Sequence, residues 1–157
     1  MQRRGFTLIE LLAVLAVAAI LMMIALPTYL DRLVREQVAE ALALAELAKV
    51  PLQAAWRAGQ PLPADNEAAG LPPADKIVNQ RVHSVALENG AIHIRFGNRA
   101  HRALQDKVLT IRAAGVPDAR VVPLAWLCAG AAVPGNMQAQ GEDRTSVPAG
   151  MLPLRCR

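Results

Sequence analysis

The chain has 157 residues, a length that suits one domain, and 54% of them are hydrophobic although only 3% are aromatic. The apolar content is therefore mostly Ala, Leu and Val, which favours long helices over the aromatic-rich core of an enzyme. The net charge of +4 falls to +2 without Arg3 and Arg4, since 15 basic residues then face 13 acidic ones. This charge does not require a nucleic-acid partner.

The first predicted element is an apolar helix. Residues 11–26 contain no polar side chain, and with residues 6–10 before them the stretch reaches 21 residues interrupted by Thr7 and Glu10. As a helix it would span roughly 31 Å, about the thickness of a bilayer hydrocarbon core. Two arginines precede it, which places residues 1–5 in the cytoplasm and the bulk of the chain outside.

Helical spacing continues beyond the apolar run, from Thr28 to Trp56. Apolar residues recur three and four positions apart there, and charged residues occupy the other faces. We expect one helix from about Phe6 to Trp56, embedded in the membrane in its first half and amphipathic in its second. Pro27 should remove one backbone hydrogen bond and bend this helix, and Pro51 should weaken its last turns.

A connector rich in Gly and Pro, residues 59–75, ends the helix. Strands are predicted at Val82–Glu88 and Ala91–Phe96, on either side of Asn89-Gly90. Both positions of a two-residue hairpin turn need positive φ, and Asn-Gly is therefore the strongest short signal for such a turn. This turn pairs Glu88 with Ala91, and it places the apolar residues on one face and the others on the opposite face. The first set is Val85, Leu87, Ile92 and Ile94; the second is Ser84, Ala86, His93 and Arg95.

Two further strands are predicted at Val108–Arg112 and Arg120–Cys128, and the tail from Ala129 to Arg157 should be mostly loop. An antiparallel sheet with one apolar face could cover the apolar stripe of the helix, giving an α+β fold. Cys128 and Cys156 lie in the exported part of the chain, where an oxidising compartment favours a disulfide.

The N-terminal residues Gly5-Phe6-Thr7-Leu8-Ile9-Glu10 follow a short basic leader. This motif resembles the processing site of type IV pilins, specifically the short-leader class a, and residues 125–128 and 147–157 are similar to the family's closing strand and cysteine-bounded loop. The resemblance implies a pilin fold: a long N-terminal helix packed in its second half against a small antiparallel sheet. It divides the chain into a leader (1–5), a transmembrane or filament-core half-helix (6–27) and a head (28–157).

The resemblance also implies residue roles. Prepilin peptidase would cut between Gly5 and Phe6, and Phe6 would be N-methylated. A carboxylate inside an apolar span costs about 3 kcal/mol, so Glu10 needs a partner; the new amine of a neighbouring subunit's Phe6 would supply one. Two other interpretations stay open. Glu10 could be a stray polar residue in an anchor, or the segment could be a secretory signal cut near Ala16-Val17-Ala18, which would leave Glu10 unexplained.

The region from Arg81 to Arg120 contains seven basic and three acidic residues and all three histidines, His83, His93 and His101. Arg95, Arg99 and Arg102 could form a patch for DNA or another anion, or simply a solvated basic face. The second is favoured because stacking aromatic residues are absent: Phe96 is predicted to point inward, and Trp56 and Trp126 to be core residues. The histidines lack metal-ligand spacing, so we expect no metal site.

We find no catalytic motif and expect neither an enzyme nor a cofactor. The resemblance implies a structural subunit of a type IV pilus, supporting adhesion, twitching motility or DNA uptake. Its partners would be other pilin subunits, the prepilin peptidase and methyltransferase, the inner-membrane assembly machinery and the membrane; DNA is a weaker candidate. The precursor would sit in the inner membrane with a periplasmic head, and the product in an extracellular pilus. Alternatives are a type II secretion pseudopilin, against which the cysteine pair argues, a DNA-binding minor pilin, and an adhesin acting through the cysteine-bounded loop.

Overall fold

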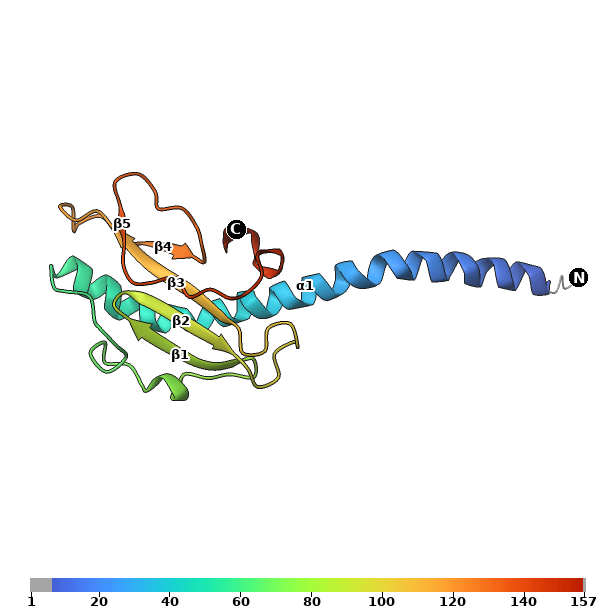
Figure 1. Cartoon of the computed structure of the whole chain (residues 1–157), viewed down its shortest axis with the longest axis horizontal. Helices are drawn as coiled ribbons and strands as arrows, with labels where there is room; N and C mark the ends of the chain where they lie inside the picture. Colours follow the sequence, from blue (N-terminus) through green and yellow to red (C-terminus); the bar gives the residue numbers. More distant parts are fainter. Residues whose placement is uncertain (1–6, 157) are drawn as a thin grey trace, which may run out of the picture. The chain divides into compact units, whose positions relative to one another are not determined.

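A computed structural model describes residues 7–156, except for the side chains of residues 26–28. Within these residues the chain forms one long helix followed by a sheet and loops (Figure 1). The elements are α1 (Leu8–Arg57), β1 (Val82–Glu88), β2 (Ala91–Phe96), β3 (Val108–Gly115), β4 (Ala125–Cys128) and β5 (Gln138–Ala139), with short 3-10 helices at Ala74–Lys76, Ala149–Met151 and Leu154–Cys156.

The predicted long helix is present as α1, which runs without interruption through positions 27 and 51. Pro51 does not end it, because Leu52 and Trp56 are both buried and their packing outweighs one lost backbone hydrogen bond. The bend expected at Pro27 stays a prediction. The chain divides into two compact units, Met1–Leu33 and Val34–Arg157, and the second is called the head below.

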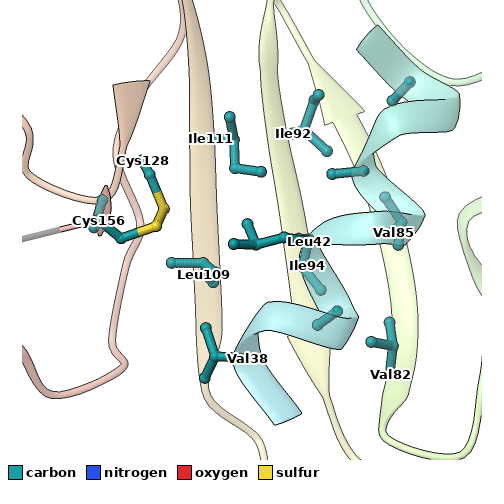
Figure 2. Close-up of a cluster of buried hydrophobic side chains, with 14 of the residues drawn as sticks. Val38, Leu42, Val82, Val85, Ile92, Ile94, Leu109, Ile111, Cys128 and Cys156 are labelled. Atoms are coloured by element: carbon teal, nitrogen blue, oxygen red, sulfur yellow. A yellow bond between two sulfur atoms is a disulfide. The ribbon is translucent and has the colours of Figure 1, made fainter. Parts of the chain in front are cut away.

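In the head, α1 contributes an apolar stripe to the core. All but one of the buried residues of this stripe lie three and four positions apart, as the sequence predicted: Val34, Val38, Ala41, Ala45, Ala48, Leu52 and Trp56, with Leu42 buried beside them. Figure 2 shows Val38 and Leu42 of α1 against Ile94, Leu109 and Ile111 of the sheet. The helix stripe and the apolar face of the sheet therefore bury each other, which confirms the α+β arrangement.

The predicted hairpin is confirmed in its strands and its register. Glu88 pairs with Ala91, Leu87 with Ile92, and Val85 with Ile94. The turn residues have the positive φ that this turn needs, 48° at Asn89 and 87° at Gly90. The sheet order is β1-β2-β3-β4, with every pair antiparallel, and β5 pairs with β3.

The later strands differ from prediction in their bounds. β3 extends to Gly115, and β4 begins at Ala125 rather than at Arg120. The backbone before Ala125 bonds to α1 instead of to a strand: Trp56 Nε1 donates to the Val122 carbonyl at 2.9 Å, and Leu124 N–H donates to Gln53 Oε1 at 3.1 Å. Pro123 has no N–H for a strand ladder. The tail is mostly loop as expected, but β5 and two 3-10 turns were not predicted.

Candidate functional site

The N-terminal half of α1 is apolar on all sides. From Leu8 to Ile24 its large hydrophobic side chains are 55–77% exposed. Among the described residues, α1 is the one helix long and apolar enough to cross a membrane. An apolar surface of this extent has to be covered by lipid or by other apolar helices. The half-helix is thus an anchor or an assembly surface, and none of the described residues of its own unit buries it.

Glu10 is the one charged side chain in this half-helix, and it caps the helix start. Its Oε2 accepts hydrogen bonds from the Thr7 N–H at 3.2 Å and from the Thr7 hydroxyl at 3.0 Å, while Glu10 N–H donates to Thr7 Oγ1 at 3.3 Å. This reciprocal arrangement is a capping box. The Thr-x-x-Glu spacing was available in the sequence, but the cap was not predicted.

The other residues of the predicted processing motif, Gly5 and Phe6, lie outside the described residues. The pairing of Glu10 with a neighbour's amine therefore stays a prediction. Within the described segment both bonds to the Glu10 carboxylate use Oε2, and no bond is made to Oε1. Among the described residues, one oxygen of the Glu10 carboxylate is therefore left for a further donor.

The expected disulfide joins Cys128 at the end of β4 to Cys156 near the C-terminus, with an S–S distance of 2.03 Å. Figure 2 shows it beside Leu109 and Ile111 at the edge of the core. Both cysteines are buried. The bond closes a segment that makes few backbone hydrogen bonds of its own, so it fixes the C-terminal segment to the sheet.

The C-terminal segment includes a strap, residues 140–146, that crosses the outer face of the sheet. At one end Gln140 N–H donates to the Ala113 carbonyl at 2.7 Å; at the other Ser146 N–H donates to the Val108 carbonyl at 2.8 Å. Gly141 lies so close to β2 that an added Cβ would be 2.5 Å from the Ala91 Cβ, and its φ is +73°. A side chain at Gly141 would push the strap away from the sheet.

The strap corrects one sequence expectation. His93 was placed on the solvated face of the hairpin, and it does lie on the outer face, but the strap covers it and it is only 8% exposed. Its Nδ1 lies 3.0 Å from Thr110 Oγ1, which also accepts a hydrogen bond from the Arg144 N–H of the strap at 3.1 Å. Alternating patterns in a hairpin cannot reveal a cover that comes from 50 residues further along the chain.

Burial lowers the pKa of His93, and its charged neighbours do not reverse the effect. Glu88, Asp143 and Glu142 raise the pKa while Arg144 lowers it. Arg144 is itself paired with Glu88 at 2.8 Å and with Glu142 at 3.2 Å. His93 Nε2 is buried and has no hydrogen-bond partner among the described residues. A second proton on the ring would therefore add an unsatisfied charged donor under the strap.

This geometry predicts a pH-dependent loss of stability. Because the folded pKa lies below the ordinary value of 6.5, the unfolded chain binds the proton first as the pH falls. The stability that depends on neutral His93 is fully present above pH 6.5. As the pH falls from 6.5 to the pKa of His93 in the folded chain, the free energy of unfolding decreases by at most about 1.4 kcal/mol per pH unit. Denaturant titration of the chain in detergent from pH 7 to 5 should show this slope. It should be absent in H93Q and retained in H83Q, because His83 is exposed.

The three arginines of the proposed anion patch lie at one end of the head but are not equivalent. Arg95 is exposed, as predicted, yet it pairs with Asp106 at 2.8 Å. Arg99 and Arg102 are exposed in the loop between β2 and β3. That loop is held to α1, because the His101 N–H donates to Gln37 Oε1 at 2.8 Å.

The two tryptophans behave differently. Trp56 is buried as expected, and the Arg120 guanidinium lies 4.4 Å from its ring centroid. Trp126 was also expected in the core but is only partly buried. It lines a groove of about 400 Å³ beside Leu42 and Lys49 of α1, and Lys49 Nζ lies 5.3 Å from its ring centroid.

Across the described residues, no group of three His, Cys, Asp or Glu side chains could hold a metal ion.

Comparisons with known proteins fit this architecture. The family model for pilin, a bacterial filament protein, matches residues 34–157, and that for the prokaryotic N-terminal methylation motif matches residues 1–26. The chain is 33% identical over 165 residues to type IV major pilin protein PilE1 of Neisseria gonorrhoeae, covering 99% of this chain and 87% of that protein. It is 29% identical over 164 residues to a fimbrial protein of Neisseria meningitidis serogroup B, covering 99% and 94%. With fimbrial protein EcpC of Eikenella corrodens it shares 44% identity over 92 residues, 57% and 60% of the two chains.

A long helix with an uncovered apolar half, joined to a small disulfide-closed α+β head, defines a filament-forming class of protein. The chain belongs to the type IV pilin family. It is a structural subunit of a pilus and polymerises with other pilin subunits. Its N-terminus carries the family's methylation motif, and its apolar helix is that of a membrane-anchored precursor.

Proposed function

We propose that the chain is made as an inner-membrane precursor with a cytoplasmic N-terminus and a periplasmic head. Prepilin peptidase cuts it between Gly5 and Phe6, the new N-terminus is methylated, and the subunit polymerises through its N-terminal helix into an extracellular filament. The observation that carries this proposal is the half-helix from Leu8 to Ile24, which is apolar and exposed on every side. The match of residues 1–26 to the methylation motif supports the position of the cut.

In this proposal Glu10 selects the register of assembly. Cleavage after Gly5 creates an amine at Phe6, next to Thr7, whose N–H and hydroxyl already hold the Glu10 carboxylate. The carboxylate thus lies at the end of the helix where the amine forms, and its Oε1 has no bond from the described residues. A neighbouring subunit's amine can approach that oxygen, so the two charges neutralise each other in an apolar surrounding.

Lipid and filament core are both apolar, so the hydrophobic effect alone gives little reason for a subunit to leave the bilayer. We propose that the inner-membrane assembly machinery supplies the work and that the Glu10–Phe6 pair supplies the specificity. The relatives are called pilins and fimbrial proteins, and the cysteine pair is present, so a pilus is favoured over a secretion pseudopilus. The filament would serve adhesion, twitching motility or DNA uptake.

A substitution at Gly5 tests the processing step. In G5V the added side chain should block the peptidase, which requires close approach to the backbone at the cut. Co-expression with a prepilin peptidase should leave G5V at the precursor mass and in the membrane, while the wild type is shortened by five residues. The control R3A keeps the cut site and should still be processed. Normal cleavage of G5V would contradict the proposed site.

A further inference from the structure

Basic side chains gather at one end of the head. Five of them form what we call the basic end: Arg35, Arg95, Arg99, Arg102 and Lys107. The loop from 97 to 107 lies beside the first turns of α1 in the head, since the His101 N–H donates to Gln37 Oε1 at 2.8 Å. Arg35 is two residues before Gln37 on the same helix, and its Nε donates to the Gly150 carbonyl at 3.2 Å.

The basic end carries the net charge of the whole head. Its five positive side chains face two acidic residues, Glu36 and Asp106, which leaves a charge of +3. Residues 34–157 together have 14 basic and 11 acidic residues, which is also +3. One turn further along α1, Glu40 is already paired with Arg81 at 2.8 Å. The charges of the rest of the head therefore sum to zero, and the positive field of the head comes from the basic end.

Arg99 and Arg102 are the side chains at the basic end best placed to meet a partner. Both are exposed, and in the part of the chain that the structure describes neither makes an ion pair. Their loop is packed: Leu104 is fully buried, and Gln105 Nε2 donates to the carbonyls of Asn98 and Ala100. Two arginines on an ordered loop lose less freedom on binding than they would on a mobile tail.

A short stretch of α1 joins the head to the apolar run. Seven residues, 27–33, lie between Leu26, the last residue of the apolar run, and Val34, where the head begins; we call them the tether. Along a helix the eight steps from Leu26 to Val34 span about 12 Å. The headgroup layer is about 5–7 Å thick on each side of the hydrocarbon core, and charges interact over about 8 Å at physiological salt. A tether of this length limits the distance between the start of the head and the lipid headgroups, so the basic end can come within electrostatic reach of them.

We propose that in the membrane-anchored precursor the basic end docks on the anionic headgroups of the bilayer, chiefly through Arg99 and Arg102. The proposal rests on the membrane anchoring put forward above. Duplex DNA carries the same phosphate chemistry, but the tether keeps lipid, not DNA, beside this end. Docking holds the stored head against the bilayer and is lost when the subunit enters a filament, where no headgroups are present.

Amide hydrogen exchange on the full-length chain tests the docking. The chain is reconstituted in vesicles of phosphatidylcholine alone and in vesicles with added phosphatidylglycerol. Each arginine near an anionic surface strengthens binding about fivefold. Exchange in residues 97–107 should therefore slow at least tenfold in the anionic vesicles, and this protection should disappear in 1 M salt.

The variant R99E/R102E should abolish the lipid-dependent protection. A matched control, R57E/K76E, removes the same charge from exposed positions elsewhere on the head and should keep the protection. Equal exchange in the two vesicles for the wild type, or equal loss in both variants, would overturn the proposal. Protection by duplex DNA in neutral vesicles, without protection by anionic lipid, would overturn it in favour of DNA binding. Failure of the wild type to insert even into neutral vesicles would refute the anchor itself.

Discussion

E10Q should reach the membrane and be cleaved like the wild type but should yield at least tenfold fewer filaments. The glutamine keeps an acceptor for the Thr7 cap, because Gln serves in a capping box as Glu does. It has no negative charge to neutralise the amine at Phe6. An unpaired charge in an apolar core costs about 3 kcal/mol, a factor of about 150 in an assembly equilibrium.

The variant T7A separates this role from capping. It removes the hydroxyl that bonds Glu10 but leaves the carboxylate in place. Loss of a cap costs only about 1 kcal/mol, so T7A should assemble within severalfold of the wild type. Filament yield is measured from sheared fractions, with the membrane pool of mature subunit as the reference. If the filament yields of T7A and E10Q fell equally, Glu10 would be acting as a helix cap, and the amine pairing would be ruled out.

Removal of the disulfide should destabilise the head strongly. The bond between Cys128 and Cys156 closes a loop with a sequence separation of 28, which corresponds to about 3–4 kcal/mol through the entropy of the unfolded chain. The double variant C128A/C156A should lose that much free energy of unfolding, a large share of the stability of a small domain. Denaturant titration in detergent measures it, with the wild type under reducing conditions as a second comparison.

The loss should not be uniform. Without the bond, the segment after β4 is attached mainly through β5 and the strap, so its amides should exchange first. The hairpin of β1 and β2, packed on α1, should keep its protection under native conditions. A double variant that unfolds within 1 kcal/mol of the wild type would show that the disulfide is not what holds the C-terminal segment.

The parts predicted well from sequence are those that depend on local pattern. The stripe on α1 and the Asn89-Gly90 hairpin follow from spacing of three and four and from turn chemistry, and both are present in the structure. The helix was predicted to continue through Pro51 to Trp56 and does so, ending at Arg57; the burial of Leu52 and Trp56 is a tertiary gain that offsets the local cost of the proline. The short length of β4 has a similar origin, since Trp56 and Gln53 take up the backbone groups that a longer strand would need.

The parts of the site that a sequence motif defines could be predicted from the sequence. The parts that depend on contacts made in the folded chain could not. Cys128 and Cys156 could be paired because the exported part of the chain offered one pairing. The cover over His93 could not be seen, because the strap at residues 140–146 has no periodic pattern and is distant in sequence. Arg95 was expected to be exposed and is, but its pairing with Asp106 depends on how the loop folds back.

Intact-mass and N-terminal peptide spectrometry of subunits from sheared filaments tests processing and assembly together. We predict a mature chain that begins at Phe6, carries one methyl group on its α-amine and retains the Cys128–Cys156 bond. Subunits that begin at any other residue, including one released near Ala18, would place no amine beside Glu10 and would contradict assembly by charge pairing.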